Sequence, residues 1–123
     1  MTLQRLLGSF GAVNAALAVA LGAYGAHVLK GDAVALNRFS TANDYQMWHA
    51  LGLIMMARLV TSGIREGALA WAGALLTAGI LLFCGNLYLL SLVEWTPWGA
   101  LTPLGGFCLI AGWLMLAWGF LRS

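Results

Sequence analysis

Four long apolar runs occupy most of this 123-residue chain, and they constrain its fold more than any other feature. The chain has only ten charged side chains, six Lys or Arg and four Asp or Glu, which are too few to cover a water-soluble domain of this size. A run of about 20 apolar residues is long enough to cross the hydrocarbon core of a bilayer as a helix. We therefore expect an integral membrane protein with little chain outside the membrane.

The apolar runs predict transmembrane helices rather than barrel strands. In lipid, backbone polar groups are satisfied only within a helix or a closed barrel, and these runs lack the alternating pattern of barrel strands. The expected fold class is an all-α integral membrane bundle that forms one domain over residues 1–123. The four predicted transmembrane helices cover residues 6–29, 43–61, 68–93 and 103–121.

Two of these runs need comment. The first follows Arg5 as the apolar part of a signal peptide would, but it is longer than the usual 7 to 15 or so residues, so we interpret it as a retained helix. The second run is the shortest, and it reaches spanning length only if residues 42–46 enter the membrane. Small residues four apart in the first run, in the stripes Ala12-Ala16-Ala20 and Ala18-Gly22-Ala26, favour close helix packing, within the chain rather than between subunits.

The connection at residues 94–99 is short, so the third and fourth helices should be antiparallel neighbours. Thr102 is predicted to cap the fourth helix, with Pro103 at its first position. The positive-inside rule then predicts the orientation, with both termini in the cytoplasm, or in the matrix of a mitochondrion. The terminal side holds Arg5, Arg58, Arg65 and Arg122, and the other side holds only Lys30 and Arg38.

A few polar side chains are expected at the outer ends of the first two helices. Asn43, Gln46 and His49 are spaced three apart, as are Tyr24 and His27, so each set shares a helical face. Since the first connection starts and ends on the outer side, we expect His27 and His49 at similar depth, close to each other or to the neighbouring Tyr45-Gln46 pair. The predicted polar cluster is Tyr24, His27, Asn43, Tyr45, Gln46 and His49, and the secondary candidates are Asn14, Asn86 and Thr102.

At these residues the chain resembles a known family, domain-of-unknown-function family 423, which includes the animal transmembrane protein 256 group. The resemblance covers residues 11–121 and implies a bundle of about four transmembrane helices in a bacterial inner membrane or a mitochondrial membrane. It implies no particular activity. The motifs that carry it are Gly22-Ala23-Tyr24-Gly25-Ala26-His27, Thr41-Ala42-Asn43-Asp44-Tyr45-Gln46-Met47-Trp48-His49-Ala50-Leu51, Gly85-Asn86-Leu87-Tyr88-Leu89-Leu90 and Thr102-Pro103-Leu104-Gly105-Gly106.

Three functional interpretations of the polar cluster differ in kind. Interhelical hydrogen bonds would make it structural, as in an accessory component that binds lipid, a second copy or a partner membrane protein. A path lined by the cluster, extended by Asn14, Thr77 and Asn86, would suit a small oligomeric transporter or channel. However, no acidic residue is expected at mid-membrane, and four helices enclose little volume. Two facing histidines would suit a haem or a metal ion, but no third or fourth ligand accompanies them.

Catalysis has the least support from the sequence. No nucleophile lies beside a base, no carboxylates are paired, and no phosphate-binding loop is present. Asp44 and Glu94 are interpreted as solvated residues at helix ends, and Cys84 and Cys108 as unpaired apolar thiols. The net charge of +2 is dispersed, which argues against a nucleic-acid partner. We therefore expect no enzyme activity, no cofactor and no metal ion, and we favour the accessory component.

Overall fold

The computed structural model describes residues 1–93 and 97–123, and the described chain is helical. The elements are α1 (Leu3–Val28), α2 (Ala33–Leu59), α3 (Glu66–Gly79), the π-helix η1 (Ile80–Cys84), α4 (Gly85–Leu92) and α5 (Leu101–Leu121). Because α3, η1 and α4 follow one another without a break, they form one rod, Glu66–Leu92. The described residues thus form four helical rods, as the sequence predicts.

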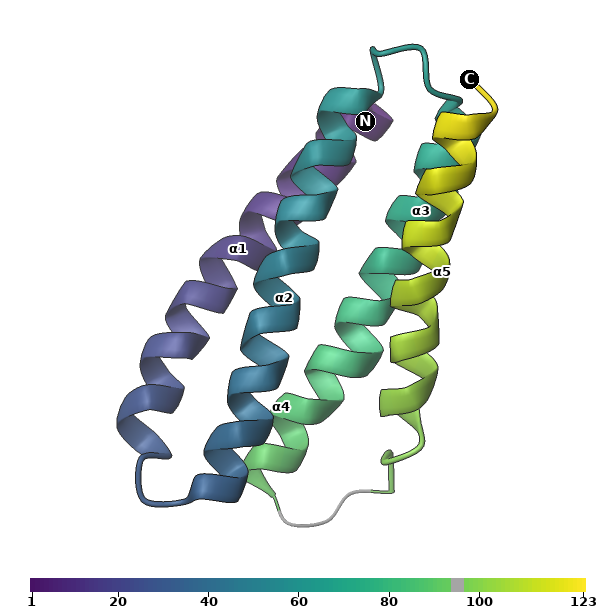
Figure 1. The fold of residues 1–123 in the computed structure, drawn as a ribbon. Helices are drawn as coiled ribbons and strands as arrows, with labels where there is room; N and C mark the ends of the chain where they lie inside the picture. The colour runs from purple at the N-terminus through teal and green to yellow at the C-terminus, as the bar shows by residue number, and fades with distance from the viewer. Residues whose placement is uncertain (94–96) are drawn as a thin grey trace.

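The four rods stand side by side along their length (Figure 1). The α1 helix packs along α2, α5 packs along α3 and η1, and α2 joins the two pairs through its contacts with η1 and α4. Both termini lie at the same end, which we call the termini end (Figure 1). The opposite end, which holds the connection from α1 to α2, is called the distal end.

Three of the rods are long and apolar enough to cross a membrane: α1, the α3–α4 rod and α5. Their outward side chains are apolar, as at Trp71, Phe107 and Leu114, which are each more than 60% exposed. A soluble monomer does not expose so much apolar surface, whereas lipid covers it at no cost. The fully buried side chains lie where α2 meets the α3–α4 rod, and they include Leu53, Met56, Leu69 and Leu76.

The prediction for the start of the second helix is wrong by ten residues. The α2 helix begins at Ala33 rather than at residue 43, because Asp32 caps it by accepting a hydrogen bond from the Ala35 backbone N–H at 3.1 Å. Its first turns are held by buried side chains such as Phe39, whose ring lies 4.7 Å from that of Tyr88. The apolar run therefore marked only the later part of a 27-residue helix.

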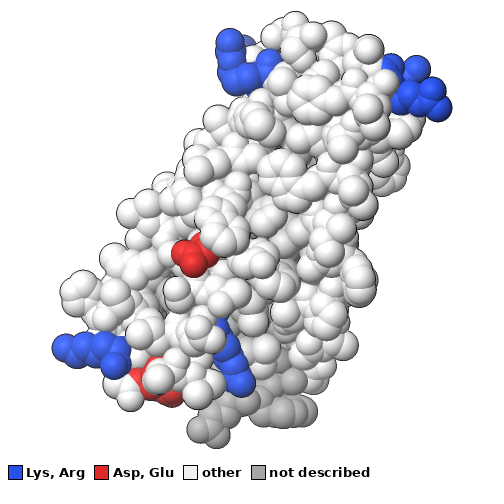
Figure 2. Space-filling view, in the orientation of Figure 1, with Lys and Arg blue, Asp and Glu red and all other residues white. Residues whose placement is uncertain are grey.

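Asp44 is consequently not a residue at a helix end. It is the twelfth residue of α2, and its side chain is exposed on the lateral face. Glu94 lies outside the described residues. Figure 2 shows Lys and Arg gathered at the two ends of the molecule, and an acidic side chain on the otherwise uncharged face between them.

Glycines let the backbones approach closely at two crossings. A Cβ added at Gly11 of α1 would lie 2.7 Å from the carbonyl oxygen of Ala50 in α2. A Cβ at Gly105 of α5 would collide with the backbone of η1 at Phe83. In α1 the buried line is Leu7, Gly11, Ala18 and Gly25. Of the predicted stripe Ala18-Gly22-Ala26, Ala18 and Gly22 pack inside the chain, whereas Ala26 is exposed. The other predicted stripe, with Ala12, Ala16 and Ala20, is exposed.

The beginning of α5 also differs from the prediction. The helix starts at Leu101 after the N-cap Ala100, which makes no side-chain capping bond. Thr102 is therefore inside the first turn, where its hydroxyl accepts a hydrogen bond from Asn86 instead of capping the helix. The bond ties the start of α5 to α4.

Candidate functional site

The central polar feature is a line of hydrogen bonds through the interior that joins α1, α2 and α4. The Asn43 amide donates to the carbonyl oxygen of Ala18 at 2.6 Å and to the Tyr88 hydroxyl at 3.1 Å. Tyr88 donates to the side-chain oxygen of Gln46 at 2.7 Å, and the Gln46 amide donates to that of Asn14 at 3.1 Å. We call Asn14, Asn43, Gln46 and Tyr88 the polar line.

The polar line lies at mid-depth in the bundle, not at the outer end. Asn14 lies 14 residues before the end of α1, and Gln46 lies 13 residues after the start of α2, so both are about 20 Å from the distal end. The early start of α2 causes this shift, because it adds about three helical turns between Asn43 and the distal end. Gly22 makes room for the line, since a Cβ there would lie 2.8 Å from the Asn43 side-chain oxygen.

The two histidines do not share a site. His27 is the penultimate residue of α1, exposed at the distal end, whereas His49 is 16 residues into α2, about 24 Å along its axis. The expectation that they lie at similar depth is therefore wrong, and the facing pair that a haem would need is absent. Among the described residues, no group of three His, Cys, Asp or Glu side chains could hold a metal ion.

Each histidine is instead bonded to its own helix. Nδ1 of His27 lies 2.8 Å from the carbonyl oxygen of Ala23, and Nδ1 of His49 lies 2.5 Å from that of Tyr45. A carbonyl only accepts, so Nδ1 carries the proton in both rings. The His49 ring is 6% exposed and packs between aromatic rings, with centroids 5.8 Å from Tyr45 and 5.9 Å from Trp113. His49 and Tyr45 thus belong to an aromatic cluster beside the polar line.

The remaining candidates fall into two places. Asn86 is buried and donates to the Thr102 hydroxyl at 2.6 Å and to the carbonyl oxygen of Trp98 at 2.9 Å. These bonds hold the connection before α5, and the Asn86 side-chain oxygen has no partner among the described residues. Tyr24 is exposed near the distal end and lies 6.2 Å from the Phe39 ring. Of the six residues in the predicted cluster, only Asn43 and Gln46 are in the polar line.

Tyr88 is the residue that the candidate list missed. It lies in the third apolar run, where a single hydroxyl gives a weak signal beside so many Leu residues. Its position two residues after Asn86 is the sequence feature that indicates a paired side chain. Two polar groups within an apolar run are costly in a membrane unless they have hydrogen-bond partners. Only the packing of α4 against α2 identifies Gln46 and Asn43 as its partners.

The chemistry of the polar line favours structure over proton transfer. A proton relay needs groups that can take up one proton and release another, as a hydroxyl, an imidazole or a carboxyl group does. Three of the four members are carboxamides, which donate from nitrogen and accept at oxygen. The line also ends on the backbone, because the Asn14 amide donates to the carbonyl oxygen of Phe10 at 3.0 Å. These bonds fasten three helices together.

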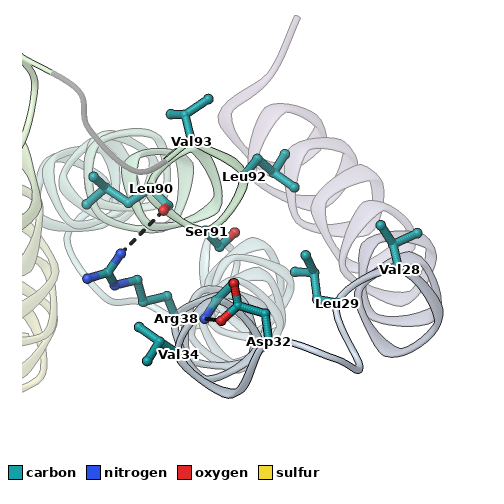
Figure 3. Close-up of a pocket in the computed structure, with 10 residues that line it drawn as sticks. Val28, Leu29, Asp32, Val34, Arg38, Leu90, Ser91, Leu92 and Val93 are labelled. Atoms are coloured by element: carbon teal, nitrogen blue, oxygen red, sulfur yellow. Dashed lines mark hydrogen bonds between the residues drawn. The ribbon is translucent and has the colours of Figure 1, made fainter.

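A pocket of about 550 Å³ lies at the distal end, between the start of α2 and the end of α4. Figure 3 shows Asp32 and Arg38 among its lining residues, with their charged groups pointing in different directions. The Asp32 carboxylate accepts from the Ala35 N–H, and the Arg38 guanidinium reaches the carbonyl oxygen of Leu90 at 3.5 Å (Figure 3). The other walls are mainly apolar, with Val28, Leu29, Val34 and Leu92.

Apolar helical rods of spanning length, a lipid-like exterior and a paired polar interior define a helical membrane protein. The chain belongs to the family described as "Protein of unknown function (DUF423)", which matches residues 21–106. The resemblance in the motifs is therefore confirmed.

Bacterial relatives extend this match over most of the chain. It is 46% identical to the UPF0382 membrane protein YwdK of Bacillus subtilis over 108 residues, which cover 86% of this chain and 88% of the relative. It is 44% identical to a UPF0382 membrane protein of Staphylococcus saprophyticus over 111 residues, which cover 89% and 91%. No solved structure matches significantly.

Proposed function

We propose that this protein is a non-enzymatic, multi-pass component of a bacterial inner membrane, or of the mitochondrial inner membrane in a eukaryote, that binds a partner membrane protein through α2. The observation that carries the proposal is the exposed Asp44 in the middle of that helix. Membrane lipid would cover the rest of the apolar lateral surface. The polar line supports an accessory role, because its carboxamides are suited to holding helices together rather than to moving protons or substrate.

In this proposal α2 is the fourth transmembrane span. It packs between α1 and the α3–α4 rod, and its 27 residues extend for about 40 Å. Its polar composition does not oppose a membrane setting, because Asn43, Gln46 and His49 have partners inside the bundle. Four spans would return the chain to its starting side, and the four arginines at the termini end favour the cytoplasm there.

The position of Asp44 makes it costly in lipid. It lies 11 residues from the start of α2, about 16 Å along the helix, which is well inside a core of roughly 30 Å that is centred on the bundle. A carboxylate at the centre of a membrane helix costs about 2.5 to 3.5 kcal/mol on insertion scales, and less toward the interface. Such residues usually face a bundle interior, so an exposed one calls for a partner from outside the chain.

The face of α2 around Asp44 has the spacing that a partner helix needs. Its residues recur at alternating intervals of three and four, which is the pattern of a left-handed helix pair. All of them are exposed except Thr41, which is half-buried. We call this face the α2 seam: Thr41, Asp44, Trp48, Leu51, Met55 and Arg58.

A second copy of this chain fits the seam poorly. Two copies with the same orientation would pair about an axis normal to the membrane, so each seam residue near that axis would face itself. Asp44 would then face Asp44, and Arg58 would face Arg58, which places like charges together twice. The seam is better suited to a different membrane protein, one with a Lys or Arg side chain at the depth of Asp44.

Site-specific photo-crosslinking tests this proposal in native membranes. A crosslinking amino acid at Leu51, within the seam, should give a discrete adduct with another membrane protein. The matched control at Leu114, which is 65% exposed on α5, should give none. Asp44→Lys should abolish the Leu51 adduct, whereas Glu66→Lys, the same charge change at the first residue of α3, should not.

A charge swap then identifies the partner's contact. The adduct partner should carry a basic residue within a membrane span, and changing that residue to Asp should restore the adduct of the Asp44→Lys protein. An adduct between two copies of this chain would replace the proposal with a homodimer. Equal adducts at Leu51 and Leu114 would refute the proposal. A Leu51 adduct that persists unchanged in the Asp44→Lys protein would also refute it.

A further inference from the structure

The pocket at the distal end carries two opposite charges on apolar walls. We infer that it binds the headgroup of a phosphatidylethanolamine, with the phosphate at Arg38 and the ammonium group at Asp32. The inference assumes the membrane setting proposed above but not the partner at the α2 seam, which begins at Thr41, farther along α2 than the pocket residues. Either one can therefore fail without the other.

The depth of the pocket suits a phospholipid headgroup. Asp32 precedes the first residue of α2, and Leu90, Ser91 and Leu92 form the last turn of α4, so the pocket lies at the level where these rods end. In a bilayer that level is the polar interface, where phosphates and amines are found. A volume of about 550 Å³ is within the usual range for small-molecule sites.

Arg38 has donors available for a phosphate. Within the described residues its guanidinium makes one hydrogen bond, to the carbonyl oxygen of Leu90 at 3.5 Å, which is at the long limit for a hydrogen bond. A guanidinium has five N–H donors in a planar fork, and this geometry matches two phosphate oxygens. Figure 3 shows the guanidinium of Arg38 next to Leu90, at one side of the pocket.

Asp32 supplies the opposite charge. One of its carboxylate oxygens accepts the Ala35 N–H at 3.1 Å, and no ion pair with Arg38 is formed in the part of the chain that the structure describes. The carboxylate therefore has acceptor sites left for an ammonium group.

This pairing selects among headgroups. A primary ammonium donates hydrogen bonds to Asp32, whereas the quaternary ammonium of phosphatidylcholine has no N–H to donate. The headgroup of phosphatidylglycerol is an anion without a cationic group, so it would satisfy Arg38 but leave Asp32 repelling it. The apolar side chains of Val28, Leu29 and Leu92 would contact the upper part of an acyl chain.

Soluble short-chain lipids test the inference on the purified full-length protein in detergent. Dihexanoyl phosphatidylethanolamine should raise the melting temperature in a saturable way, and its Kd should be at least about tenfold lower than that of the phosphatidylglycerol or phosphatidylcholine analogue. Inorganic phosphate and free phosphoethanolamine separate a lipid site from a simple anion site. Neither should match the dihexanoyl lipid, because neither has acyl chains for the apolar walls.

Two charge-removing variants and one control locate the site. Asp32→Asn keeps the helix cap, because Asn caps as well as Asp does, but removes the charge. It should therefore keep the fold and lose the preference for ethanolamine over glycerol headgroups. Arg38→Gln should raise the Kd of the ethanolamine lipid and of the glycerol lipid by about tenfold each. Lys30→Gln removes a nearby cation that does not line the pocket, so it should change neither Kd. Equal Kd values for all headgroups, unchanged preference in Asp32→Asn, or an equal effect of inorganic phosphate would overturn the inference.

Discussion

The hydroxyl of Tyr88 in α4 donates to the side-chain oxygen of Gln46 in α2 at 2.7 Å, and it accepts from Asn43 one turn earlier at 3.1 Å. One hydroxyl therefore connects two carboxamides of the same helix face. Gln46 extends the connection to Asn14 of α1. Because α1 has few direct contacts with α4, this line couples the α1–α2 pair to the third rod.

Removing the Tyr88 hydroxyl should therefore destabilise the bundle. Tyr88→Phe leaves the ring in place and the Gln46 side-chain oxygen without its donor. We therefore expect a loss of about 0.6 to 1.7 kcal/mol, from the average to the maximum for interhelical hydrogen bonds in membranes. Reversible unfolding in mixed detergent measures this loss. The control is Tyr24→Phe, at an exposed tyrosine with no hydrogen bond among those found in the structure. Equal stability of the two variants would contradict the role of the polar line.

Close approach of α1 and α2 gives a second prediction. Gly11→Ala places a Cβ about 2.7 Å from the Ala50 carbonyl oxygen, so the two helices must separate, at a cost of about 1 to 3 kcal/mol. Gly85→Ala is the matched control, because it is also helical but has nothing within 4 Å of the added Cβ. We expect Gly85→Ala to be neutral or slightly stabilising, since Ala is the better helix former. Thermal melting in detergent distinguishes the two outcomes.

The two histidines should respond differently to truncation. His49→Ala removes a buried ring from between Tyr45 and Trp113 and should cost about 1 to 3 kcal/mol. His27→Ala removes an exposed ring and should change stability by no more than about 0.5 kcal/mol.

Proton or cation flux separates the accessory component from a transporter. We expect proteoliposomes of the parent protein to show no pH-dependent flux of protons or small cations. A flux that disappears in His49→Ala while stability is retained would favour the transporter instead.

Reporter fusions test the proposed orientation. A reporter that is active only in the periplasm should be inactive when fused after Ser123 and active when inserted near Gly99, because four spans place these sites on opposite sides. A cytoplasmic reporter should give the reverse pattern. Activity on one side at both sites would remove α5 from the set of spans, because α5 alone separates them. Periplasmic activity at Ser123 with cytoplasmic activity near Gly99 would contradict the prediction, through either an inverted topology or an α2 that does not span.

The sequence by itself determined the class of protein and the main elements. Long apolar runs and few charges specify helices in a membrane, since lipid requires the backbone to bond within its own segment. The predicted ends of the first, third and fourth helices agree with the structure to within about three residues, a usual uncertainty for helix termini. The sequence motifs likewise suffice to identify the family.

The start of α2, the partners of its polar side chains and the exposure of Asp44 were decided by tertiary structure alone. Periodicity places Asn43, Asp44 and Gln46 along one helix, but it does not say which neighbour each faces. The packing of α1 on one side and α4 on the other turned Asn43 and Gln46 inward and left Asp44 outside. Burial and pairing are properties of the contact between helices, and a single helix cannot specify them.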